Sequence, residues 1–287
     1  MKTSTEIGSI TKHVSYECAV ELVAKAGFDA FDFSMFDMAR YDWERGAIIE
    51  KDHPLRGAEY SAFAKGLRKI AEESGIHCNQ SHAPFPSYIP EIRSYFKRAI
   101  ECTAIAGGKI CIIHPDNRAC AERNAELYCE LLPFAKECGV KIATENMWHW
   151  DKERDIASAA ACSHHEDFLA HIKAVNDPYL VACLDVGHAE MRGLGTSAEE
   201  MILALGEHLQ ALHIHDNDLK HDSHRIPFSM SIDFGKIMCA LKKINYKGYL
   251  TLEADQHLSD YSEDNLLCGI KELYRSAAKL SDMFENA

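Results

Sequence analysis

Six residues that can bind a metal ion or transfer a proton recur at the ends of short candidate strands. They comprise three histidines and three acids: His82, His114, Glu145, Asp185, His213 and Glu253. A single residue of this kind is typical of a capping carboxylate or a hydrogen-bonded histidine. Six of them gathered at one edge would instead form a site. Mixed imidazole and carboxylate ligands suit Mn²⁺, Mg²⁺, Co²⁺ or Zn²⁺, and they argue against a thiolate centre.

Further polar residues follow two of these positions. Asp185 is followed by Val-Gly-His188, in which Gly187 would permit a sharp turn. After His213 come Asp216 and then a loop that carries Asp222, His224 and Arg225 in the sequence HDSHRIPF. Because that loop follows a segment that ends in a candidate ligand, a role at the site is favoured over a solvated surface turn.

The remaining histidines have no such placement. The interpretation of His77 within a strand and of His149 in a loop stays open. We interpret the others as surface or helix residues: His13, His53, His164, His165, His171, His208, His221 and His257. Trp148 and Trp150 closely follow Glu145. They are equally compatible with a pocket wall and with a packed loop.

The segments that must position these residues alternate with helical patterns. Strands are expected near 5–10, 28–34, 76–82, 109–114, 140–145, 180–185, 209–214 and 248–253. Between them, apolar residues recur at helical spacing, as in the runs 19–26, 92–100 and 237–244. Thr196 and Glu199 have the spacing of a capping box that would start another helix.

The ends of the helices and the character of the strands indicate a barrel. Gly27, Gly75, Gly107 and Gly139 each follow a helical run, where a positive φ usually ends the helix. Strands such as 109–113 and 180–184 are apolar almost throughout, as parallel strands buried on both faces are. Eight such units predict a single-domain (β/α)₈ TIM barrel over residues 1–287. A doubly wound open sheet is the alternative, but no GxGxxG motif follows the first strand. The segment from 36 to 57 is expected to be a long loop that could cover an active site.

Composition limits the function classes. The 287 residues include 31 basic and 44 acidic side chains, so the net charge is −13, which argues against unselective binding of nucleic acid. An apolar share of 47% is sufficient for a sizeable core. No apolar run approaches the roughly 20 residues needed to span a bilayer. The 11 cysteines are scattered and lack any CxxC pair, which indicates reduced, mostly buried thiols and a cytoplasmic location.

Together these motifs resemble the xylose isomerase-like TIM-barrel superfamily. The resemblance covers most of the chain and rests on SHAP, IIHP, TEN, LDVGH, HIHD, DSHRIP and LTLE, in this order and at these strand ends. Its members include sugar isomerases, ketose 3-epimerases, inositol-catabolism enzymes and endonuclease IV. The set of motifs is specific for the superfamily and does not specify a substrate.

The resemblance implies a set of roles. One divalent ion (Mn²⁺, Zn²⁺, Co²⁺ or Mg²⁺) would be held by Glu145, Asp185, His213 and Glu253. The family pattern His-x-x-Asp selects His213 rather than His215, because Asp216 follows three residues later. Glu145 and Glu253 would move protons on opposite sides of a hydroxy-ketone, through an enediolate that the cation stabilises. The expected substrate contacts are His82, His114, His188, Asp222, His224 and Arg225.

The resemblance implies an isomerase or epimerase of a small sugar, sugar acid or related hydroxy-ketone. The acidic charge argues against a nucleic-acid partner, and the lack of a long apolar run argues against a membrane partner. A homo-oligomer is compatible with the resemblance. A dehydratase of a keto-inositol or a dehydroshikimate-type acid would use the same proton-transfer step. A non-catalytic sugar-binding barrel would be expected to lack a ligand or a glutamate, and none is missing.

Endonuclease IV provides the main alternative. The ligand types of its three-zinc site are matched in chain order by His82, His114, Glu145, Asp185, His188, His213, Asp222, His224 and Glu253. The acidic charge argues against a DNA substrate, as does the absence of a basic or aromatic run after His82. One departure from the sugar-family pattern concerns the loop after Asp222: a Pro-Gly-x-Gly turn is replaced by Pro227-Phe-Ser-Met-Ser, so another loop conformation is expected.

Overall fold

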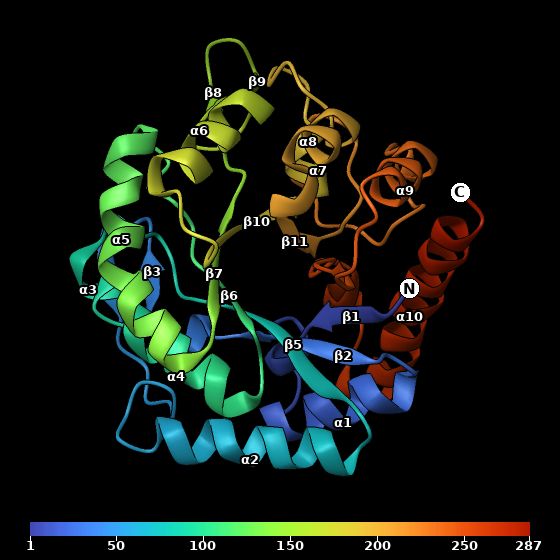
Figure 1. Ribbon diagram of the computed structural model, residues 1–287. Coiled ribbons are helices and arrows are strands. Elements are labelled where there is room, and N and C mark those ends of the chain that lie inside the picture. The colour runs from blue at the N-terminus through green and yellow to red at the C-terminus, as the bar shows by residue number, and fades with distance from the viewer.

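Eight parallel strands form a barrel in the computed structural model, which describes residues 1–287. The strands are β1 (Thr3–Glu6), β2 (Ala30–Ser34), β5 (His77–His82), β6 (Ile110–Ile112), β7 (Lys141–Glu145), β10 (Leu180–Asp185), β11 (Leu209–His213) and β12 (Leu250–Leu252). They pair in the order β11-β10-β7-β6-β5-β2-β1-β12. Ile214 closes the ring through a parallel bridge to Leu252. The predicted (β/α)₈ barrel is confirmed (Figure 1).

The strands lie where the apolar runs predict them, with one notable shift. All six residues of β10 are buried, as expected for a parallel strand covered on both faces. The first strand was expected over 5–10 but ends at Glu6. There the backbone N–H of Ser9 binds the Glu6 carboxylate and that of Thr11 binds the carbonyl of Ile7. These bonds turn the chain into the short 3₁₀ helix η1 (Ile10–Lys12).

Helices surround the barrel (Figure 1). The long ones are α1 (Tyr16–Ala26), α2 (Tyr60–Glu73), α4 (Phe96–Ala106), α5 (Ala121–Cys138), α6 (His165–Val175), α8 (Ala198–Leu205), α9 (Phe234–Lys243) and α10 (Leu266–Glu285). Two helical turns, α3 (Pro90–Arg93) and α7 (Val186–Ala189), and the 3₁₀ helices η2 (Phe36–Met38), η3 (Gly206–His208), η4 (His257–Asp260) and η5 (Glu263–Asn265) complete the set. Gly27, Gly107 and Gly139 end α1, α4 and α5 at φ of 113°, 92° and 66°, as predicted.

Two helix predictions are corrected in detail. The run 92–100 was expected to be one helix, but Ser94 and Tyr95 separate α3 from α4. Both parts still bury apolar residues. The helical spacing in the sequence therefore predicted which residues are buried but not that the helix is interrupted. The helix expected to start at Thr196 is capped by Ser197, whose hydroxyl accepts from the backbone N–H of Glu200. Thr196 and Ser197 are adjacent and both carry a hydroxyl that can cap a helix, so the sequence could not distinguish between them.

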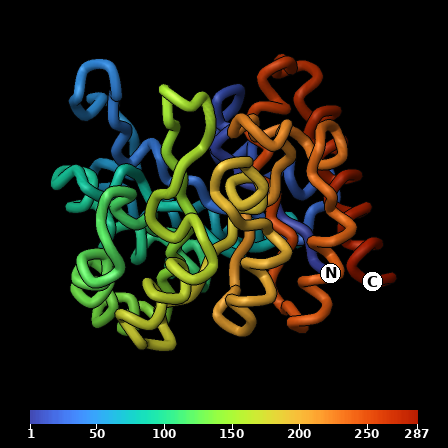
Figure 2. The backbone as a smooth tube through the Cα atoms, turned by 90° about the horizontal axis from the view of Figure 1, so that it is seen from above, coloured from blue at the N-terminus to red at the C-terminus, as the bar shows by residue number.

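Two hairpins rise from the loops that follow β2 and β7. One pairs β3 (Arg40–Asp42) with β4 (Ala47–Ile49), and the other pairs β8 (Trp148–Asp151) with β9 (Ile156–Ala159). Figure 2 shows both projecting from the same side of the molecule, one in blue and one in yellow-green. The first lies in the segment expected to cover an active site.

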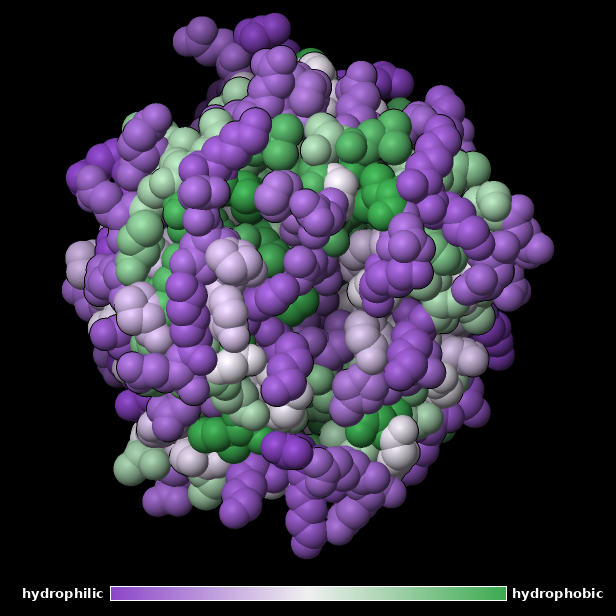
Figure 3. All heavy atoms as spheres, in the orientation of Figure 1, coloured by the Kyte–Doolittle hydropathy of each residue, from purple (hydrophilic) through white to green (hydrophobic).

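The core fills the space between barrel and helices, and the surface is mostly polar. On the face shown in Figure 3, hydrophilic residues predominate over smaller apolar areas. The large apolar side chains that are exposed are Trp43, Ile49, Leu203 and Met230. Only five of the 11 cysteines are buried, fewer than predicted. No helix combines the length and the apolar character that crossing a membrane requires.

Candidate active site and metal centre

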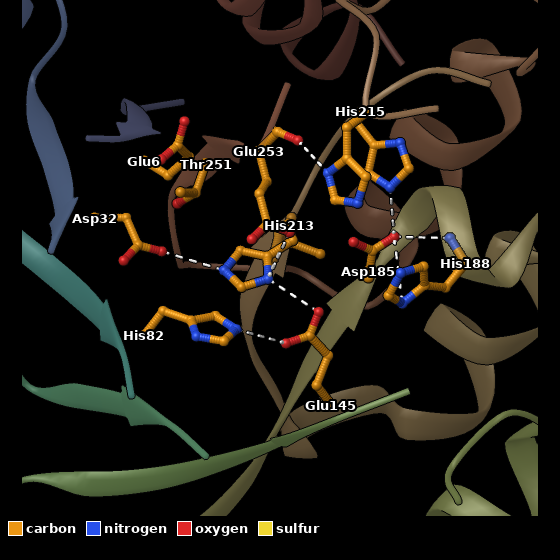
Figure 4. Close-up of polar contacts among 12 residues, drawn as sticks. Glu6, Asp32, His82, Glu145, Asp185, His188, His213, His215, Thr251 and Glu253 are labelled. Atoms are coloured by element: carbon orange, nitrogen blue, oxygen red, sulfur yellow. Dashed lines mark hydrogen bonds and ion pairs between the residues drawn. The ribbon is translucent and has the colours of Figure 1, made fainter. Parts of the chain in front are cut away.

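All six strand-end residues meet at one end of the barrel. His82, Glu145, Asp185 and His213 are the last residues of β5, β7, β10 and β11. His114 and Glu253 follow β6 and β12 by two residues and one residue. The carboxyl ends of parallel strands lie on the same side of a barrel, so these six side chains converge. Figure 4 shows this for His82, Glu145, Asp185, His213 and Glu253.

A cavity of about 550 Å³ opens above them. Its lining includes His82, His114, Glu145, His188, Asp222, His224 and Glu253 from the predicted set. Asp185 and His213 are fully buried beneath it. Aromatic walls come from Phe36, Phe85 and Trp148, and Tyr41 and Ile49 of the first hairpin close one side.

Four predicted ligands form one compact group. The ligand atoms of Glu145, Asp185, His213 and Glu253 all lie within 4.8 Å of one another. Oε1 of Glu145 and Oε2 of Glu253 lie 3.0 Å and 3.3 Å from the same atom, Nδ1 of His213. Ligands held at about 2.0–2.2 Å from an ion are at most roughly 4.4 Å apart. The 4.8 Å limit is a few tenths of an ångström wider than that, so small side-chain movements would bring these oxygen and nitrogen atoms onto one divalent ion.

Glu145 also belongs to a second group. Its Oε2 lies 3.1 Å from Nε2 of His114 and 3.7 Å from Nε2 of His82. These two histidine nitrogens are themselves 2.9 Å apart. Nδ1 of His82 donates to the backbone carbonyl of Ala83, so its Nε2 faces His114 and Glu145 without a proton in the neutral ring. Two imidazole nitrogens and one carboxylate oxygen thus point at the same small volume.

A third group surrounds Asp222. Nδ1 of His188 and Nδ1 of His224 each lie 2.8 Å from a backbone carbonyl oxygen, so both carry their proton there. Their Nε2 atoms face Asp222 at 3.3 Å and 3.2 Å. His215 lies 3.1 Å from Asp185 through Nε2 and stacks on His224 at 4.0 Å. The structure thus places His213 with the two glutamates and His215 with this third group.

The buried polar atoms of this region are incompletely paired. Oδ2 of Asp185 is buried and has no hydrogen-bond partner, while Nε2 of His215 and Oδ1 of Asp222 have charged neighbours at 3.1 Å and 3.2 Å but no contact with hydrogen-bond geometry. Buried polar groups are normally satisfied, and buried carboxylates need a compensating positive charge. These incompletely paired atoms and the donor chemistry of the first group fit a bound cation.

Electrostatics separate the two glutamates. Burial would raise the pKa of Glu145, but attraction to His213 and His114, with their hydrogen bonds, holds it well below its ordinary value. Burial raises the pKa of Glu253 to about 7, although His213 and His224 oppose the shift. Two neighbouring carboxyl groups whose pKa values are shifted in opposite directions are typical of an acid–base pair.

The environment lowers the pKa of one histidine at the site and raises that of another. Burial and His82 lower the pKa of His114 to about 4. Burial also lowers the pKa of His188, but attraction to Asp185 and Asp222 outweighs it and raises the pKa to about 10. The region around Asp222 therefore favours positive charge.

Arg225 and Asp216 have places that the motifs did not indicate. Arg225 is not among the residues that line the cavity, and its backbone pairs with that of Asp216. The Asp216 carboxylate accepts from the backbone N–H groups of Met230, Ser231 and Ile232. Phe228 adopts a positive φ of 73°, which is how this loop turns without the glycines of the sugar-family pattern. Asp216 thus holds the loop, and a substrate contact of Arg225 stays a prediction.

Two acids near the site were missed by sequence reasoning. Glu6 at the end of β1 lines the cavity, and Asp32 within β2 is fully buried. Burial raises the pKa of Glu6, although Ser9 opposes the shift through its hydrogen bonds. A signal existed for both, because each is an acid inside a short strand that is otherwise buried.

Comparison with known proteins places the chain in a family. Residues 20–276 match the xylose isomerase-like TIM barrel. The chain belongs to this family. An uncharacterized protein of Methanocaldococcus jannaschii, MJ1311, is 25% identical over 190 residues, which cover 60% of this chain and 62% of that protein. The match therefore spans about three fifths of the length of this curated relative.

Solved structures share the fold of this xylose isomerase-like barrel across nearly their whole length. A D-psicose 3-epimerase from Clostridium cellulolyticum H10, solved with D-tagatose, has a TM-score of 0.71 at 15% identity and covers 98% of this chain and 99% of its own. A 3-keto-D-glucoside 4-epimerase from E. coli has a TM-score of 0.69 at 14% identity, with coverages of 96% and 99%. The IolI protein, solved with a bound zinc atom, has a TM-score of 0.69 at 18% identity, with coverages of 100% and 99%.

Proposed function

We propose that this protein is a divalent-metal-dependent isomerase or epimerase of a small sugar, sugar acid or related hydroxy-ketone. The observation that carries the proposal is the convergence of Glu145 and Glu253 on Nδ1 of His213 beside Asp185. Two carboxylates that share a cation from different strands can flank one substrate carbon. The sugar epimerases and the zinc-containing IolI protein with the same fold are consistent with this chemistry.

The residues of the first group would hold the ion. A divalent ion bound by Glu145, Asp185, His213 and Glu253 would polarise a substrate carbonyl and so make the neighbouring C–H more acidic. Glu145, kept ionised by its histidine neighbours, is the candidate base. Glu253, with its higher pKa, is the candidate acid that returns the proton from the other side. The reverse reaction exchanges the two roles.

The cavity suits a small polyol. Nε2 of His188, the histidine pair His82 and His114, and the carboxylate of Asp222 offer polar contacts on its floor. Phe36, Phe85 and Trp148 offer aromatic faces that can pack on the apolar faces of a sugar ring or chain. A volume of about 550 Å³ lies within the range of small-molecule sites.

Proton exchange with solvent tests the proposal directly. The Mn²⁺-loaded protein should epimerise or isomerise a member of a ketose, keto-acid and inosose panel and should incorporate deuterium from D₂O beside the carbonyl. Glu145→Gln should lose at least roughly 10²-fold of this exchange, because the amide cannot accept the proton. Glu101→Gln, a matched change on α4 that lies outside the cavity, should retain the wild-type rate.

Wild-type exchange in Glu145→Gln, or turnover that survives complete chelation, would contradict the proposal. Formation of a dehydrated product would instead assign the same proton-transfer step to a dehydratase of a keto-inositol or dehydroshikimate-type acid.

A multi-zinc phosphodiesterase is the second candidate. The specific observation in its favour is that each of the three groups around His114, His213 and Asp222 combines at least one imidazole nitrogen with at least one carboxylate. The charge of −13 argues against a DNA substrate. Nicking of an abasic duplex by the zinc-loaded protein, together with three bound ions per chain, would support this candidate and count against the first.

A further inference from the structure

Asp32 is a buried acid behind the candidate metal centre. It lies within β2 and is fully buried. Its Oδ2 accepts from Nε2 of Gln80 at 2.8 Å and lies 3.2 Å from Nε2 of His213 (Figure 4). The two nitrogens of the His213 ring therefore face different partners: Nε2 faces Asp32, and Nδ1 faces Glu145 and Glu253.

The arrangement around Gln80 fixes which of its atoms faces Asp32. Its Oε1 accepts from Nδ2 of Asn79 at 3.2 Å and from the hydroxyl of Thr251 at 3.3 Å. The amide nitrogen must therefore point toward Asp32. That nitrogen also lies 3.3 Å from the backbone carbonyl of Leu212, which can only accept. Asp32 thus meets a donor from Gln80 and remains an acceptor toward His213.

A neutral imidazole carries its proton on one nitrogen, and a metal binds the other. If the proton of His213 were on Nδ1, it would occupy the position between Glu145 and Glu253 that a cation requires. An acceptor at Nε2 favours the other tautomer and also makes the ring a stronger ligand. Asp32 is the residue that supplies this acceptor.

The charge of Asp32 also needs an explanation. Its Oδ1 is buried without a hydrogen-bond partner, and its Oδ2 meets His213, which supplies no positive charge while its ring is neutral. A buried carboxylate that lacks compensating positive charge is strongly destabilising. A cation on the far side of the His213 ring would provide this charge through the polarised Nε2–H group.

We propose that Asp32 is a positioning residue that keeps the proton of His213 on Nε2 and so presents Nδ1 to a divalent cation. The inference rests on the proposed metal centre and deepens it, because it assigns a role to an acid on β2 that lies outside the ligand set. Asp32 would act only through His213 and would not contact the substrate.

The test measures metal affinity and the imidazole tautomer rather than turnover. Histidine-labelled protein loaded with Zn²⁺ should show, by two-bond ¹H–¹⁵N correlation, a His213 ring with a proton on Nε2 and metal on Nδ1. Competition with a chromophoric chelator should show Zn²⁺ binding weakened about 10–100-fold in Asp32→Asn and in Asp32→Ala. The Asp32→Asn change keeps the shape of the side chain and removes its charge.

Asn124→Ala is the matched control. Asn124 is buried on α5 and lies 3.1 Å from Nε2 of a different histidine, His171, away from the cavity. Asn124 also holds the backbone of Asp116 and Ala119 in the loop after His114, but it contacts none of the four proposed ligands, so Zn²⁺ affinity should stay within about twofold of wild type. If the loss of a buried polar side chain acted only by disturbing the structure, Zn²⁺ binding would be weakened equally in the Asp32 and Asn124 variants.

Three outcomes would overturn the inference: wild-type Zn²⁺ affinity in a folded Asp32 variant, equal losses in Asp32→Ala and Asn124→Ala, or a zinc-loaded wild-type protein whose His213 lacks the Nε2 proton. The last outcome is measured on the wild-type protein, so it does not depend on whether a variant folds. A wild-type protein that binds Zn²⁺ through Nδ1 of His213 but turns over no sugar would contradict the proposed function and leave this inference intact. A wild-type protein that binds no Zn²⁺ would contradict both.

Discussion

At the scale of single residues, the third histidine group depends on one glycine. The sequence suggested that Gly187 permits a sharp turn, but its φ is not positive and it lies within the helical turn α7. The requirement is for space, since a Cβ atom there would lie 1.9 Å from the ring of His215. Gly187 therefore allows His215 to pack against α7 and to face Asp185.

A pair of glycine substitutions tests this packing. Gly187→Ala should destabilise the protein by roughly 1–3 kcal/mol, because the methyl group must displace the His215 ring. Gly66→Ala, in an exposed position of α2 with no atom within 4 Å of the added Cβ, should stabilise it by about 0.5–1 kcal/mol through helix propensity. Urea unfolding of the two variants measures both effects. Equal stability of Gly187→Ala and wild type would contradict the steric argument.

At the scale of elements, the strands and the hairpins have different tasks. The strands end in the candidate ligands and hold them on a rigid, buried frame. The hairpins β3–β4 and β8–β9 add walls to the cavity, through Tyr41 and Ile49 in the first and Trp148 in the second. In β8 the side chains of a strand alternate, so Trp148 and His149 point to opposite faces. Of the two tryptophans that the sequence left open, Trp148 lines the pocket, whereas Trp150 is not among the lining residues and stacks on His221.

The alternation in β8 provides a matched pair of variants. Trp148→Ala should raise KM by roughly five-fold with little change in kcat, because an aromatic contact worth about 1 kcal/mol is lost equally in the bound and reacting states. His149→Ala removes the exposed neighbour on the other face and should behave as wild type. Steady-state kinetics on the substrate identified by the panel checks the pair. A fall in kcat alone for Trp148→Ala would show that this wall acts on the reaction itself.

At the scale of the whole molecule, the acidic balance has a local consequence. Glu6, Asp32, Glu145 and Asp185 are all buried at or near one end of the barrel, with Asp222 and Glu253 beside them. Carboxylates gathered in this way repel one another unless positive charge lies between them. Binding of a cation to the folded state alone should therefore stabilise the whole barrel.

Metal removal tests this coupling. Adding Mn²⁺ or Zn²⁺ at 100 times its Kd to the chelated protein should stabilise it by about 2.7 kcal/mol. For a chain of this size, that corresponds to a rise in Tm of roughly 4–5 °C. Differential scanning calorimetry gives the shift, and elemental analysis of the same sample gives the number of ions per chain. An unchanged Tm would show that no ion binds the folded state preferentially.

Much of the site could be predicted because a parallel barrel converts sequence position into spatial position. His82, Glu145, Asp185 and His213 end predicted strands, and the carboxyl ends of all eight strands must meet. Local periodicity and strand-end chemistry were therefore enough to select them. The Gly-terminated helices were predictable for a similar reason, since the helix signal and its end signal are both local.

The partners of each group were decided only by the tertiary structure. Three contacts depend on strands that are distant in the chain. Glu145 and Glu253 share Nδ1 of His213, His215 faces Asp185, and Asp32 faces Nε2 of His213. The tilt and stagger of a closed barrel set these pairings, and no local pattern encodes them. The sequence by itself determined which residues reach the mouth of the barrel. The packing of the closed sheet decided which atoms meet there, because each such contact joins elements that only the folded chain brings together.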